Sequence, residues 1–189
     1  MTNQLDNHTV IEKDNLVSKE IARHYQNTFQ QHGSTPKGVG WPNALTTNRL
    51  YDRMLRVIDN LYGIEYPTIL DVGCGYGGLL DYIKNKKIKV DYTGLDILDD
   101  MIKAAKKRHP NKKFYQGDLL ALYNTIGTFD YVVCNGVLTA KNENDLYTMI
   151  NFAKTLIKKC LAVVVWVLLL IFVLPMQSGM LVKIFIEIH

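Results

Sequence analysis

The spacing of apolar residues changes at about residue 64. Before that point, apolar positions recur at helical intervals, which predicts a helix over residues 16–29 that ends before Gly33. A second helix is predicted by the apolar positions Leu50, Met54, Val57, Ile58 and Leu61, with Gly63 past its end. Residues 33–43 between them are rich in Gly and Pro and predict a loop. We therefore expect residues 1–63 to form an N-terminal helical segment.

After residue 64, short apolar runs alternate with amphipathic segments. Strands are expected over residues 68–72, 89–96, 113–117 and 129–134, and from 161 to about 168. Helices are expected over residues 78–85, 98–109 and 144–158, with a turn or short helix over 119–126. This alternation predicts an α/β fold, a Rossmann-like doubly wound parallel sheet with helices on both faces.

The C-terminal part departs from that rhythm. Residues 160–174 form one apolar run, and from residue 161 onward only Lys183 and Glu187 are formally charged. The run is shorter than a typical membrane span of about 20 residues and longer than a typical strand. Three explanations stay open: strand five followed by a truncated remainder, a short membrane anchor, or an out-of-frame end. Residues 180–189 alternate weakly and could pair with strand five.

Composition fits one cytoplasmic domain with a sizeable core. The 189 residues are 48% hydrophobic and 21% charged, and the net charge is +4. This charge is weak support for nucleic-acid binding, and the lysine-rich stretches fit solvated helix faces. The N-terminus lacks the pattern of a secretory signal. Three cysteines (Cys74, Cys134 and Cys160) without metal-like spacing indicate reduced thiols and no metal site.

Candidate chemistry gathers where the predicted strands end. Gly73, Gly75 and Gly77 follow the first strand, Asp96 ends the second, and Gln116-Gly117-Asp118 and Asn135 end the third and fourth. Open α/β sheets bind ligands at this edge, and bare glycine backbone lets a nucleotide cofactor approach closely. The pattern Gly73-x-Gly75-x-x-Gly78 also fits a nicotinamide dinucleotide. Asp71, just before the glycines, would repel a pyrophosphate and attract an ammonium group.

These motifs, over residues 16–158, resemble the class I S-adenosylmethionine-dependent methyltransferases. ILDVGCGYG is similar to their glycine-rich motif, TGLDI to the ribose-binding strand end, QGDLL to the adenine-contacting motif, and FDYVVCNGVLT to the strand facing methyl transfer. HYQNTFQQHGSTPKGVGW is similar to a lid found in a bacterial subgroup. The resemblance implies strand order 3-2-1-4-5, with terminal strands 6 and 7 missing or degenerate here. It divides the chain into a lid (1–63), the cofactor-binding domain (64–170) and an atypical hydrophobic tail (171–189).

The resemblance also implies roles for individual residues. The glycines would approach the methionine part of S-adenosylmethionine, and Asp71 would lie near its ammonium group. Asp96 would accept hydrogen bonds from both ribose hydroxyls. Asp118 and the Leu119 amide would bind the adenine, and the Asn135 carbonyl would line the pocket. The implied binding set is Asp71, Gly73, Cys74, Gly75, Gly77, Asp96, Ile97, Asp118, Leu119 and Asn135.

We expect a methyltransferase acting on a small-molecule acceptor, and no sequence feature nominates a catalytic base. The absence of an Asn/Asp-Pro-Pro-aromatic box after strand four argues against nucleic-acid bases as acceptors. The alternatives are an NAD(P)-binding oxidoreductase and an inactive remnant tethered by its tail. Tyr25, His24, His32 and Trp41 could reach over the site or be ordinary lid residues.

Overall fold

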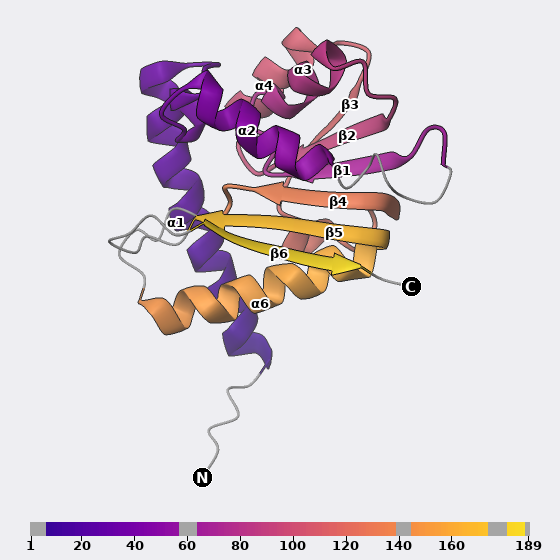
Figure 1. Ribbon diagram of the computed structural model, residues 1–189. Helices are drawn as coiled ribbons and strands as arrows, with labels where there is room; N and C mark the ends of the chain where they lie inside the picture. Colours follow the sequence, from indigo (N-terminus) through magenta and orange to yellow (C-terminus); the bar gives the residue numbers. More distant parts are fainter. Residues whose placement is uncertain (1–6, 57–63, 139–144, 174–180, 188–189) are drawn as a thin grey trace.

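The parallel sheet has the strand order expected from the sequence. The computed structural model describes residues 7–56, 64–138, 145–173 and 181–187. Their six strands form one sheet in the order β3-β2-β1-β4-β5-β6 (Figure 1). The strands are β1 (Thr68–Val72), β2 (Asp91–Asp96), β3 (Lys113–Gln116), β4 (Phe129–Asn135), β5 (Val164–Val173) and β6 (Leu181–Glu187). The first five pair in parallel, which confirms the predicted order 3-2-1-4-5.

The last strand, β6, pairs antiparallel with β5, from Val167 opposite Glu187 to Val173 opposite Leu181. The weak alternation near the C-terminus therefore does correspond to a strand that pairs with strand five. The hydrophobic run is divided between the end of a helix and β5, and its residue 174 lies outside the described residues. Among the described residues, no helix combines the length and apolar character needed to cross a membrane.

Helices cover both faces of the sheet. They are α1 (Asn7–His32), η1 (Lys37–Val39), α2 (Ala44–Leu55), α3 (Gly78–Asn85), α4 (Asp99–Arg108), α5 (Leu119–Leu122) and α6 (Leu146–Val163). One buried cluster joins α2, α3 and α4 to the sheet through Met54, Leu80 and Ile102. The other joins α1 and α6 to the opposite face through Val17, Phe152 and Leu156. In Figure 1, α1 runs past the edge of the sheet at which β4 and β5 end.

The predicted boundary between the last helix and strand five is wrong. Helix α6 continues to Val163, five residues beyond its expected end, and β5 begins at Val164 rather than at residue 161. Cys160 and Val163 are buried and extend the face of Met149, Phe152 and Leu156 at helical spacing. An unbroken apolar run does not reveal this spacing, because it fits the periodicity of a helix and that of a strand equally well.

The N-terminal helices also differ from expectation. Helix α1 begins at Asn7 instead of residue 16. Leu50 and Met54 lie on the buried face of α2, whereas Val57, Ile58, Leu61 and Gly63 lie outside the described residues. The strand predicted from residue 89 starts at Asp91. Strand β1 and helix α3 have the bounds that the sequence predicted.

Candidate active site

A cavity lies at the carboxyl ends of β1, β2 and β4. Its volume is about 1020 Å³, with open solvent at its mouth included. Helix α1 and the segment around η1 contribute one wall, so the cavity lies between the sheet and the N-terminal helices. Nine of the ten residues expected to bind a cofactor line it: Asp71, Gly73, Cys74, Gly75, Asp96, Ile97, Asp118, Leu119 and Asn135. The exception is Gly77.

The glycine turn after β1 requires glycine at two positions. Gly73 and Gly75 have φ values of 76° and 55°, in the left-handed region that other residues rarely adopt. A Cβ atom on Gly75 would lie 2.9 Å from Cγ1 of Val39, and one on Gly73 would collide with Val137. The amide of Gly73 donates to the Leu95 carbonyl at 2.8 Å, which fixes the turn to β2. The turn thus presents bare backbone to the cavity.

Gly77 is not a lining residue of the cavity and packs against His109. It adopts φ 84° as the N-cap of α3, and a Cβ atom there would lie 2.9 Å from Cδ2 of His109. The buried His109 ring accepts from Lys84 Nζ at Nδ1 (2.8 Å), and its Nε2 donates to the Gly77 carbonyl at 3.2 Å. Burial and the nearby Lys84 ammonium lower the pKa of His109, so the ring is neutral at pH 7. Sequence reasoning missed His109, because nothing in its local pattern distinguishes it from a helix-end residue.

Asp96 holds the glycine turn and the start of α4 together. Its Oδ2 accepts from the Gly75 amide at 2.8 Å and its Oδ1 from the Leu98 amide at 2.9 Å. The residue is 8% exposed, and burial raises its pKa against the lowering effect of these amides. A carboxylate offers about four acceptor sites, so both oxygens can accept further hydrogen bonds from a ligand in the cavity. Asp96 can therefore hold the turn and still bind a ligand.

Asp71 is a buried acid of the cavity. It is 3% exposed and accepts a hydrogen bond from Tyr92 Oη at 2.6 Å. Burial raises its pKa to about 7, the Tyr92 hydrogen bond lowers it, and the neighbouring Asp96 raises it. Such a carboxyl gains most from a cationic group placed beside it, because that group stabilises the ionised form.

Asp118 and Asn135 complete the polar part of the cavity. Asp118 is the N-cap of α5 and accepts from the Leu120 amide at 2.9 Å through Oδ1. At the end of β4, the buried Oδ1 of Asn135 has no hydrogen-bond partner among the described residues. A buried amide oxygen without a partner is unfavourable, so a ligand that donates a hydrogen bond there would be stabilised.

The N-terminal segment crosses the cavity and is attached on both sides of it. Tyr25 Oη donates to the Gly136 carbonyl at 2.7 Å, next to Asn135. Gln26 Nε2 donates to Asp100 Oδ2 at 2.7 Å, at the start of α4. Tyr25 and Trp41 line the cavity, whereas His24 and His32 are exposed and are not among its lining residues. Two of the four N-terminal candidate residues, Tyr25 and Trp41, therefore line the cavity.

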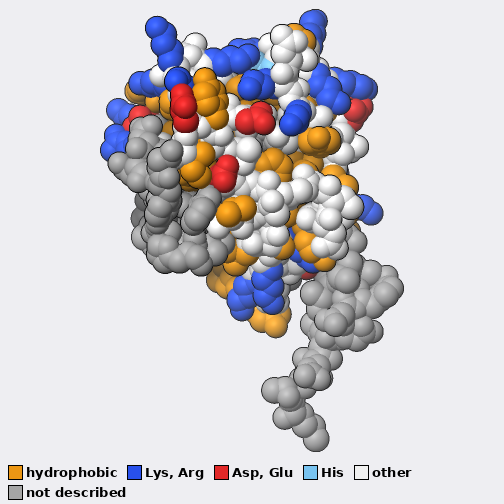
Figure 2. Space-filling view, turned by 90° about the vertical axis from the view of Figure 1, so that its right-hand side faces the viewer, with side chains coloured by type: hydrophobic (Ala, Val, Ile, Leu, Met, Phe, Trp, Pro, Cys, Tyr) orange, Lys and Arg blue, Asp and Glu red, His pale blue; other side chains and the backbone are white. Residues whose placement is uncertain are grey.

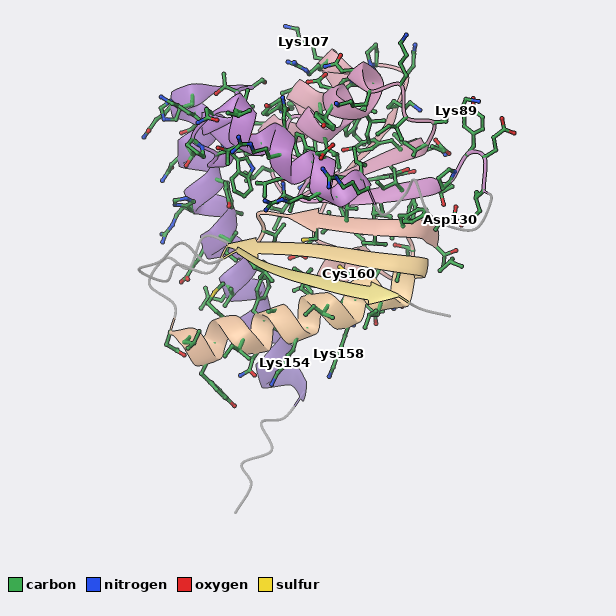
Figure 3. The ribbon with its side chains drawn as sticks, viewed as in Figure 1. Lys89, Lys107, Asp130, Lys154, Lys158 and Cys160 are labelled. Carbon is green, nitrogen blue, oxygen red and sulfur yellow. The ribbon has the colours of Figure 1, made fainter. Side chains whose placement is uncertain are left out.

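The charged side chains that line the cavity are all acids among the described residues. Asp71, Asp96 and Asp118 line it, and no Lys, Arg or His is among its described lining residues. Lysines and arginines cluster instead on the outer surface (Figure 2). Lys89, Lys107, Lys154 and Lys158 all point outward in Figure 3. Among the described residues, no group of His, Cys, Asp and Glu could hold a metal ion.

Part of the sequence matches a known domain family and several known proteins. The methyltransferase domain family matches residues 69–159. A phthiotriol/phenolphthiotriol dimycocerosates methyltransferase of Mycobacterium tuberculosis is 37% identical over 94 residues, which are 49% of this chain and 33% of that protein. A fatty-acid O-methyltransferase of Mycolicibacterium smegmatis is 36% identical over 100 residues, which are 52% of this chain and 36% of that protein. The chain therefore aligns with only about a third of the length of these relatives.

The fold is shared with solved structures of low sequence identity. A magnesium protoporphyrin IX methyltransferase from Synechocystis PCC 6803, solved with bound S-adenosylmethionine, superposes with a TM-score of 0.54 at 19% identity. The alignment covers 93% of this chain and 80% of that one. The family match over residues 69–159, these relatives and the sheet order together support a class I S-adenosylmethionine-dependent methyltransferase.

Proposed function

We propose that this chain binds S-adenosylmethionine in the cavity at the carboxyl ends of β1, β2 and β4, and transfers its methyl group to a small-molecule acceptor. The observation that carries the proposal is the convergence of nine expected residues on one cavity. Two relatives named as methyltransferases of a fatty acid and of a complex lipid support a small-molecule acceptor.

The residues present fit this cofactor. Gly73 and Gly75, both with positive φ, line the cavity with their backbone, and the methionine part would lie against it. Asp71 suits the ammonium group, because a cation beside it would restore its ionised form. Asp96 would accept from the ribose hydroxyls with its remaining lone pairs, and Asp118 from the adenine amino group.

The chemistry needs little from the protein beyond binding and orientation. The bound sulfonium supplies an activated methyl group: an acceptor lone pair bonds to the methyl carbon, the carbon–sulfur pair stays on sulfur, and the acceptor proton leaves to water. The chain holds both partners in line and limits access of water through the lid. Such positioning contributes up to about 7–11 kcal/mol in the ideal case. We nominate no catalytic base.

Calorimetric titration of the full chain with S-adenosylhomocysteine and, separately, with NAD tests the assignment. We expect S-adenosylhomocysteine alone to bind, and Asp96→Ala to weaken its affinity at least tenfold. Asp91→Ala is the matched control, because Asp91 is an exposed acid at the other end of β2. Binding of NAD in place of S-adenosylhomocysteine would favour the oxidoreductase alternative. Binding of neither would favour the inactive remnant.

We further propose that the domain works in the cytoplasm, with residues 1–63 as its lid and residues 64–170 as its cofactor-binding part. The packing of α1 against η1, and the attachments of Tyr25 and Gln26, support treating the N-terminal segment as part of the same domain. The truncated-end and shifted-frame explanations for residues 171–189 stay predictions. Translating the gene in its other frames would test the second, since a methyltransferase-like continuation should appear there.

A further inference from the structure

The cavity wall outside the acids and the glycine turn is almost entirely apolar. It is formed by Ile21 and Ala22 of α1, Val39 and Trp41 of the lid, and Phe152 and Leu156 of α6. Apart from the acids and Asn135, the oxygen-bearing side chains of the lining are the hydroxyls of Ser18, Tyr25, Tyr51 and Tyr76. These residues line the same cavity as the glycine turn, so an acceptor held by them would lie beside the cofactor.

The charges of the lining disfavour an anionic acceptor. Its three charged side chains, Asp71, Asp96 and Asp118, are all acids among the described lining residues. A carboxylate or phosphate entering the cavity would lose its hydration, and no cation among these residues would replace the lost water. Under the proposed function the three acids bind the cofactor, so the apolar wall around the acceptor leaves a permanently charged amine without a counter-ion.

The polar groups near the end of β4 favour an acceptor that donates a hydrogen bond. The Oδ1 of Asn135 is buried without a partner among the described residues, and Gly136 follows it directly. The carbonyl of Gly136 already accepts from the Tyr25 hydroxyl. An alcohol or phenol can donate to Asn135, whereas a carboxylate has only acceptors to offer.

Resting on the proposed function, we propose that the methyl acceptor is an uncharged, largely apolar molecule that presents a hydroxyl group beside Asn135. The apolar wall stabilises its body, and the unpaired amide oxygen binds its hydroxyl proton.

Matched probe pairs test this preference at neutral pH. The full chain, saturated with S-adenosylhomocysteine, is titrated in a calorimeter with 2-naphthol and 2-naphthoate, and with 1-decanol and decanoate. We expect the neutral member of each pair to bind at least about tenfold more tightly. Equal or tighter binding of the carboxylates overturns the inference. So does the absence of binding by all four probes while S-adenosylhomocysteine binds. A chain that does not bind S-adenosylhomocysteine refutes the proposed function itself.

A charge placed on the apolar wall tests whether the acceptor lies near the end of β4, beside Asn135. Trp41 lies close to Gly136, 3.2 Å from the position a Cβ atom would take there. Trp41→Arg adds a cation beside the end of β4, and Trp41→Gln removes the ring without adding charge. We expect the arginine variant to bind the carboxylate probes at least about tenfold better than the glutamine variant does, with S-adenosylhomocysteine affinity alike in both. Equal carboxylate affinity in the two variants overturns the location.

If the Trp41 variants do not fold, the matched probe pairs on the unmodified chain decide the inference. Far-UV circular dichroism and the S-adenosylhomocysteine titration establish folding in each case.

Discussion

Because Gly77 lies close to His109, replacing Gly77 by alanine should lower the free energy of unfolding for two separate reasons. Gly77→Ala has two costs. The left-handed backbone at φ 84° costs about 1–2 kcal/mol for a residue with a Cβ atom. The new Cβ atom would also lie 2.9 Å from Cδ2 and 3.2 Å from Nε2 of His109, and such overpacking costs about 1–3 kcal/mol. The free energy of unfolding should fall by about 2–5 kcal/mol in total.

Three further variants isolate these parts: Gly127→Ala, His109→Ala and the double variant His109→Ala/Gly77→Ala. Gly127→Ala is the matched control, because Gly127 has φ 92° but no atom within 4 Å of a Cβ position, so only the backbone cost of about 1–2 kcal/mol applies. In a His109→Ala background, Gly77→Ala should lose its steric cost and approach the effect of Gly127→Ala. The double-mutant cycle should therefore give a coupling of about 1–3 kcal/mol between the two positions.

Urea unfolding followed by circular dichroism measures the free energy of unfolding of the unmodified chain and of the four variants. The reasoning is refuted if Gly77→Ala destabilises no more than Gly127→Ala does. It is refuted equally if removing the His109 ring leaves the effect of Gly77→Ala unchanged.

Three other predictions follow from the contacts of the site. Asp96→Ala leaves the amides of Gly75 and Leu98 without their acceptor, and should reduce the free energy of unfolding by about 2–6 kcal/mol in urea titrations; a loss below 0.5 kcal/mol would contradict this. Because the pKa of Asp71 is raised to about 7, the folded state holds its proton more tightly than the unfolded state, so its contribution to stability falls as pH rises from about 4 through 7. Asp71→Asn should therefore flatten the decrease in stability between pH 5 and 8, and parallel profiles would argue against the shift. Tyr25→Phe removes the hydrogen bond to Gly136 and should increase amide exchange in α1, at a cost of about 0.5–1.5 kcal/mol; unchanged exchange would exclude this contact as an attachment of the lid.

Local patterns were sufficient for the sheet and for most of the site. The apolar run that ends in Asp71 and the glycines fixed strand β1, and the acids at later strand ends marked the same edge. Parallel strands bring their carboxyl ends together whatever the intervening sequence, so Asp96, Asp118 and Asn135 converge as expected.

What the sequence did not predict depends on contacts between distant residues. The α6–β5 boundary lies inside a uniform apolar run, where no spacing distinguishes a helix from a strand. His109 acquires its role only because α4 places it behind Gly77. Val39 and Val137 look like ordinary apolar residues, and only the folded chain places them against the glycine turn.

The hydrogen bond between Tyr25 and Gly136 joins residues separated by 111 positions. During synthesis, the ribosome releases α1 long before the end of β4 exists, so the helix has nothing to cover. Chain elongation at about 5–20 residues per second delays this meeting by about 6–22 seconds. Throughout that interval the apolar face of α1 is open to other chains, and early chaperone binding at the N-terminus would protect the nascent protein.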